Sequence, residues 1–266
     1  SALVAISIFL FKEAGTKMDL LTKILGFGMI VLIMAIAFIS QPPIGQAMQH
    51  TFVPVEFDAL ATITLVGGTV GGYISFAGAH RLLDSGFSGE KDLPQTNRGA
   101  GSAILLTAII RYLLFLATLG VVMSGTDINA GNPTASVFEN ATGTIGRRLF
   151  GLMIWSAAIT SVVGAAYTSL TFLRSFHPFI EKQQSKLTIL FILVSALVFL
   201  VIGTPVKVLV FVGTLNGFVL PFALAILLVA VQNKRIIGNY QHPKWLLLLG
   251  WIVVLLLLWL GGKALW

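Results

Sequence analysis

Four glycines in one apolar stretch are the residues of this sequence best suited to bind a solute through the backbone. Gly67, Gly68, Gly71 and Gly72 fall in the middle of the largely apolar stretch 59–80. Each glycine costs about 1 kcal/mol relative to alanine in a helix interior, and backbone groups freed inside hydrocarbon add to that cost. One hypothesis is a helix broken within the membrane, whose carbonyl and N–H groups bind a substrate. The alternative is a small-residue packing face, since Gly68 and Gly72 share one side of a helix.

Arg111 is a charge inside a predicted membrane span, at 103–124. A charge at the bilayer centre costs about 2.5–3.5 kcal/mol on insertion scales, so this side chain should face the protein interior and find a partner. No Asp or Glu of this chain lies at comparable depth. The expected partner is therefore a carboxylate outside this chain, a row of carbonyls or an anionic substrate. The alternative is that the span boundaries are displaced and Arg111 reaches the membrane surface.

His80 and Pro221 are two further residues of the predicted spans that could serve transport. His80 could relay protons in a proton-coupled carrier. The competing interpretation is an interfacial residue beside an Arg81–Asp84 pair. Pro221 lies inside a later span, where proline kinks a helix. Such a kink would leave carbonyls near Gly217 free to face a pathway.

The composition indicates a membrane protein. Of the 266 residues, 56% are hydrophobic and 10% are charged, against roughly 25% charged in a soluble domain. The net charge is +7, but the basic residues form no patch, so nucleic acid is not an expected partner. The chain contains no cysteine, which excludes disulfides and thiolate sites within it. It also contains no G-x-S-x-G, Walker or H-E-x-x-H motif, so we expect neither an enzyme nor a bound cofactor.

Apolar stretches long enough to cross a bilayer recur along the chain, each of about 20 residues. They predict a partial span at 1–11 and full spans near 18–40, 59–80, 103–124, 147–175, 187–204, 207–231 and 244–262. The chain begins directly in an apolar run, without the charged region of a signal peptide. We therefore expect an N-terminally truncated piece of a longer protein.

The basic residues alternate between the two sides of these spans. One side holds basic residues, Lys or Arg, in each of the connections 12–23, 81–98, 174–186 and 232–244. The other side holds only Arg147, Arg148, Lys207 and Lys263. The positive-inside rule predicts that the first set is cytoplasmic, and we expect the membrane to be a bacterial cytoplasmic membrane.

Several short motifs occur in the order found in a known transporter family. Residues 68–70 (Gly-Thr-Val), followed by the glycine pair, resemble the sixth helix of the Nramp (natural resistance-associated macrophage protein) family. This is a family of divalent metal-ion transporters. In its sixth helix, a Gly-x-Thr run precedes Met-Pro-His. Residues 19–26 resemble the start of the family's fifth helix, and 160–168 its small-residue eighth helix. Residues 220–223 (Leu-Pro-Phe-Ala) and 233–238 resemble the tenth helix and its cytoplasmic end. The resemblance covers nearly the whole chain, from the tail of the family's fourth helix through its eleventh.

The sequence departs from this family where the family binds metal. Gly71-Gly72-Tyr73 stands in place of Met-Pro-His, so the thioether that favours soft transition metals is missing. Val219 stands where the family has Gln, and Asn216 is the nearest amide. The family's first helix, with its Asp-Pro-Gly-Asn motif, would precede this chain. The resemblance therefore implies the scaffold but not the metal ligands, and it leaves room for a harder ion such as Mg²⁺ or for a different substrate.

Together these observations predict an all-α polytopic membrane protein, with residues 1–266 as a single transmembrane transporter domain and the inverted-repeat scaffold that the resemblance implies. The resemblance implies secondary transport of a divalent metal cation, coupled to H⁺ or running downhill. The alternatives are a symporter of a small organic solute, such as an amino or carboxylic acid, and a non-transporting membrane scaffold. The expected partners are the cargo and the lipid bilayer. The predicted site comprises Gly68, Gly71, Gly72 and Tyr73 for substrate binding, Asn216 and Pro221 for binding or gating, and Arg111 and His80 for charge or proton coupling.

Overall fold

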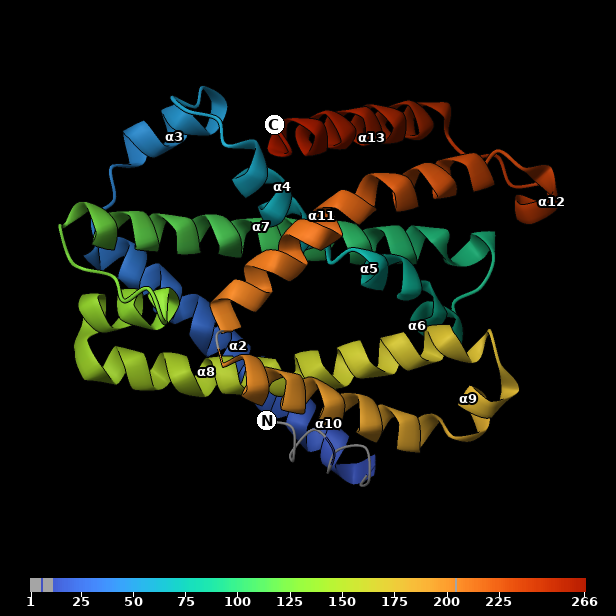
Figure 1. The fold of residues 1–266 in the computed structure, drawn as a ribbon, viewed down its shortest axis with the longest axis horizontal. Helices are drawn as coiled ribbons and strands as arrows, with labels where there is room; N and C mark the ends of the chain where they lie inside the picture. The colour runs from blue at the N-terminus through green and yellow to red at the C-terminus, as the bar shows by residue number, and fades with distance from the viewer. Residues whose placement is uncertain (1–5, 7–11, 204) are drawn as a thin grey trace.

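The computed structural model describes residue 6 and residues 12–266 except 204, and every element in that part of the chain is a helix (Figure 1). The predicted partial span 1–11 lies almost entirely outside the described residues. The α-helices are α2 (Lys12–Ile39), α3 (Ile44–Phe52), α4 (Ala59–Val70), α5 (Tyr73–Ala77), α6 (Ala79–Asp84), α7 (Leu93–Met123), α8 (Pro133–Arg174), α9 (Pro178–Lys182), α10 (Gln184–Ile202), α11 (Pro205–Ala230), α12 (Lys234–Ile237) and α13 (Lys244–Ala264). A 3₁₀ turn, η1 (Glu90–Asp92), precedes α7.

Five of these helices are long and apolar enough to cross a membrane: α7 with its preceding turn, α8, α10, α11 and α13. A sixth span results if α2, from Lys23, and α3 are counted as one pair bent by 108°. Large apolar side chains such as Leu200, Phe211 and Leu255 are exposed on these helices. Surface that faces lipid needs no polar cover, so this exposure fits a bilayer rather than water. The predicted polytopic, all-helical membrane protein is confirmed, but the described residues form five such spans, or six with the bent pair, in place of the seven full spans predicted.

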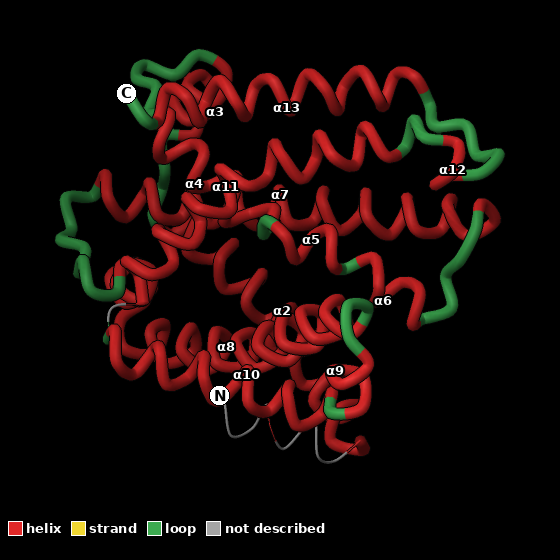
Figure 2. Tube along the Cα trace, turned by 45° about the vertical axis from the view of Figure 1, so that its right-hand side comes forward, coloured by secondary structure: helices red, strands yellow, loops and turns green. Residues whose placement is uncertain are grey.

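The helices pack in two groups (Figure 2). In the first, α4, α11 and α13 enclose a small core of Ile63, Leu220, Leu257 and Leu260. In the second, α2, α7 and α8 pack around Ile33, Ile36, Ala117, Phe138 and Phe150, and α10 lies along α8.

The segment from α4 to α6 passes from one group to the other. Its first part, α4, packs against α11 and α13, whereas α5 and α6 pack mainly against α8. With 12 residues, α4 covers about 18 Å of a hydrocarbon core about 30 Å thick. The stretch 59–80, which was predicted as one span, is therefore divided among the short helices α4, α5 and α6.

Several predicted connections are helical, which corrects the boundaries drawn from the sequence. Residues 12–23, expected as a loop, lie in α2, and α7 begins at Leu93 rather than near 103. The connections 174–186 and 232–244 contain the short helices α9 and α12. Hydropathy marks where a helix becomes apolar, whereas helix propensity is high for Lys, Glu, Leu and Ala alike. Polar helix ends are therefore missed by a search for apolar stretches.

The region before the predicted span 147–175 also differs from the expectation. There α8 begins at Pro133, and Gly143, with φ 70° and ψ −161°, interrupts its helical backbone. The side chain of Asn132 caps the start by accepting a hydrogen bond from the Ala135 N–H. This cap and the following proline are the usual signals of a helix start, and they escape a search based on hydropathy.

Candidate substrate-binding site

The predicted break lies at Gly71 and Gly72, and the structure confirms it. Helix α4 ends at Val70, Gly71 is left-handed (φ 81°, ψ 20°), Gly72 adopts φ 54° and ψ −127°, and α5 begins at Tyr73. These positive φ values are readily adopted only by glycine. The Gly71 N–H donates to the Gly67 carbonyl at 3.0 Å, so the helix closes before the chain turns away. A helix end of this kind leaves last-turn carbonyls without their usual intrahelical partners.

Asn216 of α11 lies directly against this break. A Cβ added at Gly72 would be less than 3.0 Å from the Oδ1 and Cγ atoms of Asn216. Further from the break, the hydroxyls of Thr64 and Thr214 are 2.7 Å apart and join the two helices by a hydrogen bond. The structure therefore brings Gly72 and Asn216 together, as their assignment to one site requires.

A close backbone contact between α4 and α11 holds Asn216 in place. A Cβ at Gly67 would lie less than 3.0 Å from backbone atoms of Gly213 and Gly217, and one at Gly217 would meet the carbonyl of Ile63. Such an approach requires glycine on both helices, as in small-residue packing of membrane helices. The packing face lies at Gly67, whereas the sequence hypothesis placed it at Gly68 and Gly72; Gly68 is exposed, and a Cβ there would meet nothing within 4 Å. Gly71 and Gly72 form the break.

Arg111 of α7 reaches the same break from another side. Its Nη1 donates to the Oγ1 of Thr69, in the last turn of α4, at 2.6 Å. The Thr69 hydroxyl in turn donates to the Leu65 carbonyl. The partner in the described part of the chain is thus a neutral hydroxyl, which was not among the partners expected from the sequence, and the Arg111 side chain is exposed rather than turned into the interior.

The remaining predicted site residues lie at or beyond the edge of this cluster. Tyr73 is the first residue of α5, and its side chain lies outside the described part of the chain. Pro221 is buried within α11, beside the core residue Leu220. Gly217, in the preceding turn of α11, packs against α4. The sequence had predicted instead that carbonyls near Gly217 face a pathway. His80 lies in α6, with its ring 5.7 Å from that of Phe172 in an edge-to-face contact.

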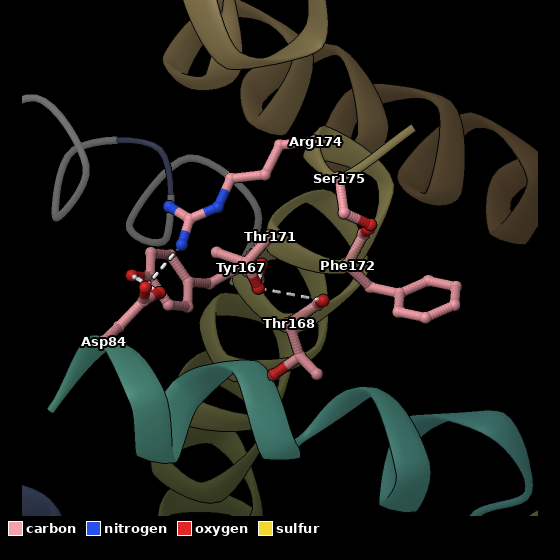
Figure 3. A network of polar contacts seen from close by, with 7 residues as sticks. All are labelled: Asp84, Tyr167, Thr168, Thr171, Phe172, Arg174 and Ser175. Carbon is pink, nitrogen blue, oxygen red and sulfur yellow. Dashed lines mark hydrogen bonds and ion pairs between the residues drawn. The ribbon is translucent and has the colours of Figure 1, made fainter. Parts of the chain in front are cut away.

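A second polar cluster, which the sequence alone did not indicate, ties α6 to α8 (Figure 3). Arg174 forms an ion pair with Asp84, and the Tyr167 hydroxyl donates to the other carboxylate oxygen of Asp84 at 3.1 Å. The Arg81 side chain, which was expected to pair with Asp84, lies outside the described residues. The helix-spacing rule finds partners within one helix, whereas Arg174 approaches from a different one.

The Arg174 guanidinium beside Asp84 holds the pKa of this carboxyl below its ordinary value, and the Tyr167 hydroxyl acts in the same direction. Replacing Asp84 by Asn is expected to lower the apparent Tm of the full-length protein by about 1–4 °C at neutral pH. A carboxyl with a depressed pKa stabilises the fold above its ordinary pKa and loses this contribution as the pH falls through the folded-state value. The difference between Asp84→Asn and wild type should therefore shrink in acid.

Thermal unfolding in detergent at several pH values measures this effect. Asp127→Asn makes the same chemical change in the connection between α7 and α8 and serves as the control. An equal shift in both variants, or a difference that does not depend on pH, would contradict the assignment of this ion pair.

The family match decides what kind of protein contains this site. The family model described as "Natural resistance-associated macrophage protein-like" (Nramp) matches residues 1–266. The chain belongs to the Nramp family. The resemblance inferred from the order of the motifs is thereby confirmed.

Two relatives of this Nramp chain are bacterial. It is 52% identical over 261 residues to the uncharacterized membrane protein YcsG of Bacillus subtilis (strain 168), covering 98% of this chain. It is 49% identical over 264 residues to an uncharacterized membrane protein of Haemophilus influenzae, covering 99% of this chain. The chain spans 65% and 66% of the lengths of these relatives. Both relatives are membrane proteins, which agrees with the helices described above.

Metal ligands of the usual kind do not converge in the described part of this Nramp chain. No group of three or more His, Cys, Asp or Glu side chains there could hold a metal ion. The oxygen donors near the break are the side-chain amide of Asn216, the hydroxyl of Thr69 and backbone carbonyls. Such neutral oxygen donors suit hard cations better than soft ones.

Two cavities of the described region lie away from the break. One of about 240 Å³ separates α3 from α7 and is lined by Pro43, Gln46, Ala47, His50, Thr51, Phe115, Leu119 and Met123. Another of about 260 Å³ lies beside α6 and the start of α7. Neither includes a residue of the break or its contacts, so neither bears on the proposed site.

Proposed function

We propose that this chain is part of a secondary-active transporter that moves a divalent metal cation across the membrane, with the break between α4 and α5 as its substrate site. Membership in a family of metal-ion transporters supports the activity. The observation that carries the site is the interruption at Gly71 and Gly72 together with Asn216. An irregular backbone at membrane depth is tolerated where protein or a water-filled cavity satisfies it, and in many transporters it binds the cargo.

A hard cation fits the donors of this site best. Carbonyl oxygens of the last turn of α4 and the Asn216 amide would replace part of the hydration shell of Mg²⁺ or Mn²⁺. Gly71-Gly72-Tyr73 offers no thioether, so selectivity for soft metals is not expected. Transport would run downhill or be coupled to H⁺. In the coupled case, His80 of the broken segment would relay the proton.

A small organic solute, such as an amino or carboxylic acid, is the second candidate cargo. The observation that favours it is the position of Arg111, whose guanidinium is hydrogen-bonded to the end of α4 next to the break. A guanidinium binds carboxylates through two parallel hydrogen bonds and repels a bare cation. The same site would then serve an anionic or zwitterionic cargo.

The proposed location is a bacterial cytoplasmic membrane, with residues 81–98, 174–186 and 232–244 and the polar start of α2 (12–23) on the cytoplasmic side. The two bacterial relatives support the location, and the orientation rests on the distribution of basic residues in the sequence. The single transmembrane domain over 1–266 is part of the same proposal.

Uptake into proteoliposomes by the full-length protein tests the activity. The cargoes are Mn²⁺, Mg²⁺ and a panel of amino and carboxylic acids, each measured with and without a pH gradient. Saturable uptake of a metal supports the first candidate, and saturable uptake of an acid without metal supports the second. Absence of uptake of every cargo, with correctly inserted protein, would favour a non-transporting scaffold.

A further inference from the structure

Arg111 is held beside the break by a contact that leaves its charge uncompensated. Its Nη1 donates to the Thr69 hydroxyl oxygen at 2.6 Å. The Thr69 hydroxyl hydrogen is directed to the Leu65 carbonyl, so Thr69 can act toward Arg111 only as a neutral acceptor. Thr69 therefore orients the guanidinium without neutralising it.

No carboxylate in the described part of the chain pairs with Arg111. The ion pairs there are Arg147 with Glu139 and Arg174 with Asp84. Arg111 belongs to the long apolar helix α7, where an uncompensated charge is costly and usually marks a functional position. A guanidinium carries five N–H donors in a rigid planar fork, and the contact with Thr69 engages one of its nitrogens.

The surroundings of this guanidinium leave room for a ligand. Gly68, in the same turn of α4 as Thr69, is exposed, and a Cβ added there would meet nothing within 4 Å. The Arg111 side chain is exposed as well. Gly68 directly precedes Thr69, so this open position is next in the chain to the residue that holds the Arg111 guanidinium.

We propose that Arg111, oriented by Thr69, binds a carboxylate group of the transported cargo. This inference rests on the proposed transport function and specifies the cargo further. The carboxylate has two possible sources: a free organic acid, or a divalent metal ion that crosses the membrane as its carboxylate complex. In both cases a negative group occupies the fork that a bare cation would avoid.

Uptake by the full-length protein in proteoliposomes separates these sources. Lactate, succinate and glutamate are supplied alone, Mn²⁺ and Mg²⁺ alone, and each metal together with each acid. Uptake is expected only where an acid is present, and Arg111→Gln is expected to reduce it by about 10- to 100-fold. Arg111→Lys should fall between wild type and Arg111→Gln, because an ammonium keeps the charge but not the fork. Arg98→Gln, the same change at the polar start of α7, should transport as wild type does.

A binding measurement on the wild-type protein decides the inference even if a variant fails to fold or no tested cargo is transported. Phenylglyoxal modifies accessible arginines, and mass spectrometry of the digested protein reports the rate at Arg111 and Arg98 separately. The acids are expected to slow modification of Arg111 several-fold and to leave Arg98 unchanged. Equal rates with and without every acid would overturn the inference, as would saturable metal uptake in acid-free buffer that Arg111→Gln leaves unchanged. If wild type takes up no cargo while Arg111 is protected, the transport proposal fails and the carboxylate site stands.

Discussion

Replacing Gly67 by alanine is expected to destabilise the protein strongly, because the added methyl group has no space between α4 and α11. It would lie less than 3.0 Å from three backbone atoms of Gly213 and Gly217. Backbone atoms cannot rotate away as a flexible side chain can, so the two helices must separate. Overpacking of this kind costs typically about 1–3 kcal/mol and occasionally more, and the Thr64–Thr214 hydrogen bond across the same interface would be lengthened.

Gly68→Ala is the matched control, since it makes the same change at the neighbouring residue of the same helix. A Cβ at Gly68 would meet nothing within 4 Å, and alanine is the better helix former by about 1 kcal/mol. Thermal unfolding of the full-length protein in detergent should therefore show a large decrease in Tm for Gly67→Ala and none for Gly68→Ala. Equal stability of the two variants would mean that α4 and α11 do not approach as closely as described.

Replacing Gly72 by alanine is expected to abolish transport, with a decrease of at least about 100-fold in initial uptake rate. Two effects combine at this position. The backbone adopts φ 54° and ψ −127°, which L-residues rarely adopt, and the new methyl group would contact the Oδ1 and Cγ atoms of Asn216. The break can then persist only if α5 or Asn216 moves, and either movement displaces the groups proposed to bind the cargo.

Two further variants separate these effects. Gly86 also has a positive φ of 84° but nothing within 4 Å of an added Cβ, so Gly86→Ala introduces backbone strain without the contact and should transport at nearly the normal rate. Adding Asn216→Ala to Gly72→Ala removes the two closest atoms. Partial recovery of folding relative to Gly72→Ala alone would show that the contact matters. Full uptake by Gly72→Ala would contradict the proposed site.

The break itself could be predicted from the sequence because its cause is local. Gly71 and Gly72 interrupt an apolar stretch, and the backbone there has left-handed and other positive-φ conformations that glycine alone adopts freely. Long apolar helices such as α10 and α13 were equally evident, since hydropathy reports them directly.

The contacts around the break could not be predicted, because they depend on which helices become neighbours. Nothing in the sequence near Gly67 indicates that Gly213 and Gly217 lie opposite. Thr69 and Arg111 are 42 residues apart, and Asp84 and Arg174 are 90 apart. For the latter pair, the charge alternation placed both residues at ends of spans on one side of the membrane, which was the only available signal.

The most direct test of the substrate site is protection of a thiol placed in the break. The 266 residues contain no cysteine, so Gly68→Cys introduces one reporter into this region of a full-length protein that is cysteine-free elsewhere. Gly99→Cys, at the exposed start of α7 with nothing within 4 Å of its Cβ, is the control. We expect saturating concentrations of the transported cargo to slow alkylation of Gly68→Cys by a water-soluble reagent at least about fivefold. Alkylation of Gly99→Cys should be unaffected. The alkylated Gly68→Cys protein should no longer transport. Unchanged alkylation under saturating cargo, with full transport by the alkylated protein, would show that the cargo binds elsewhere.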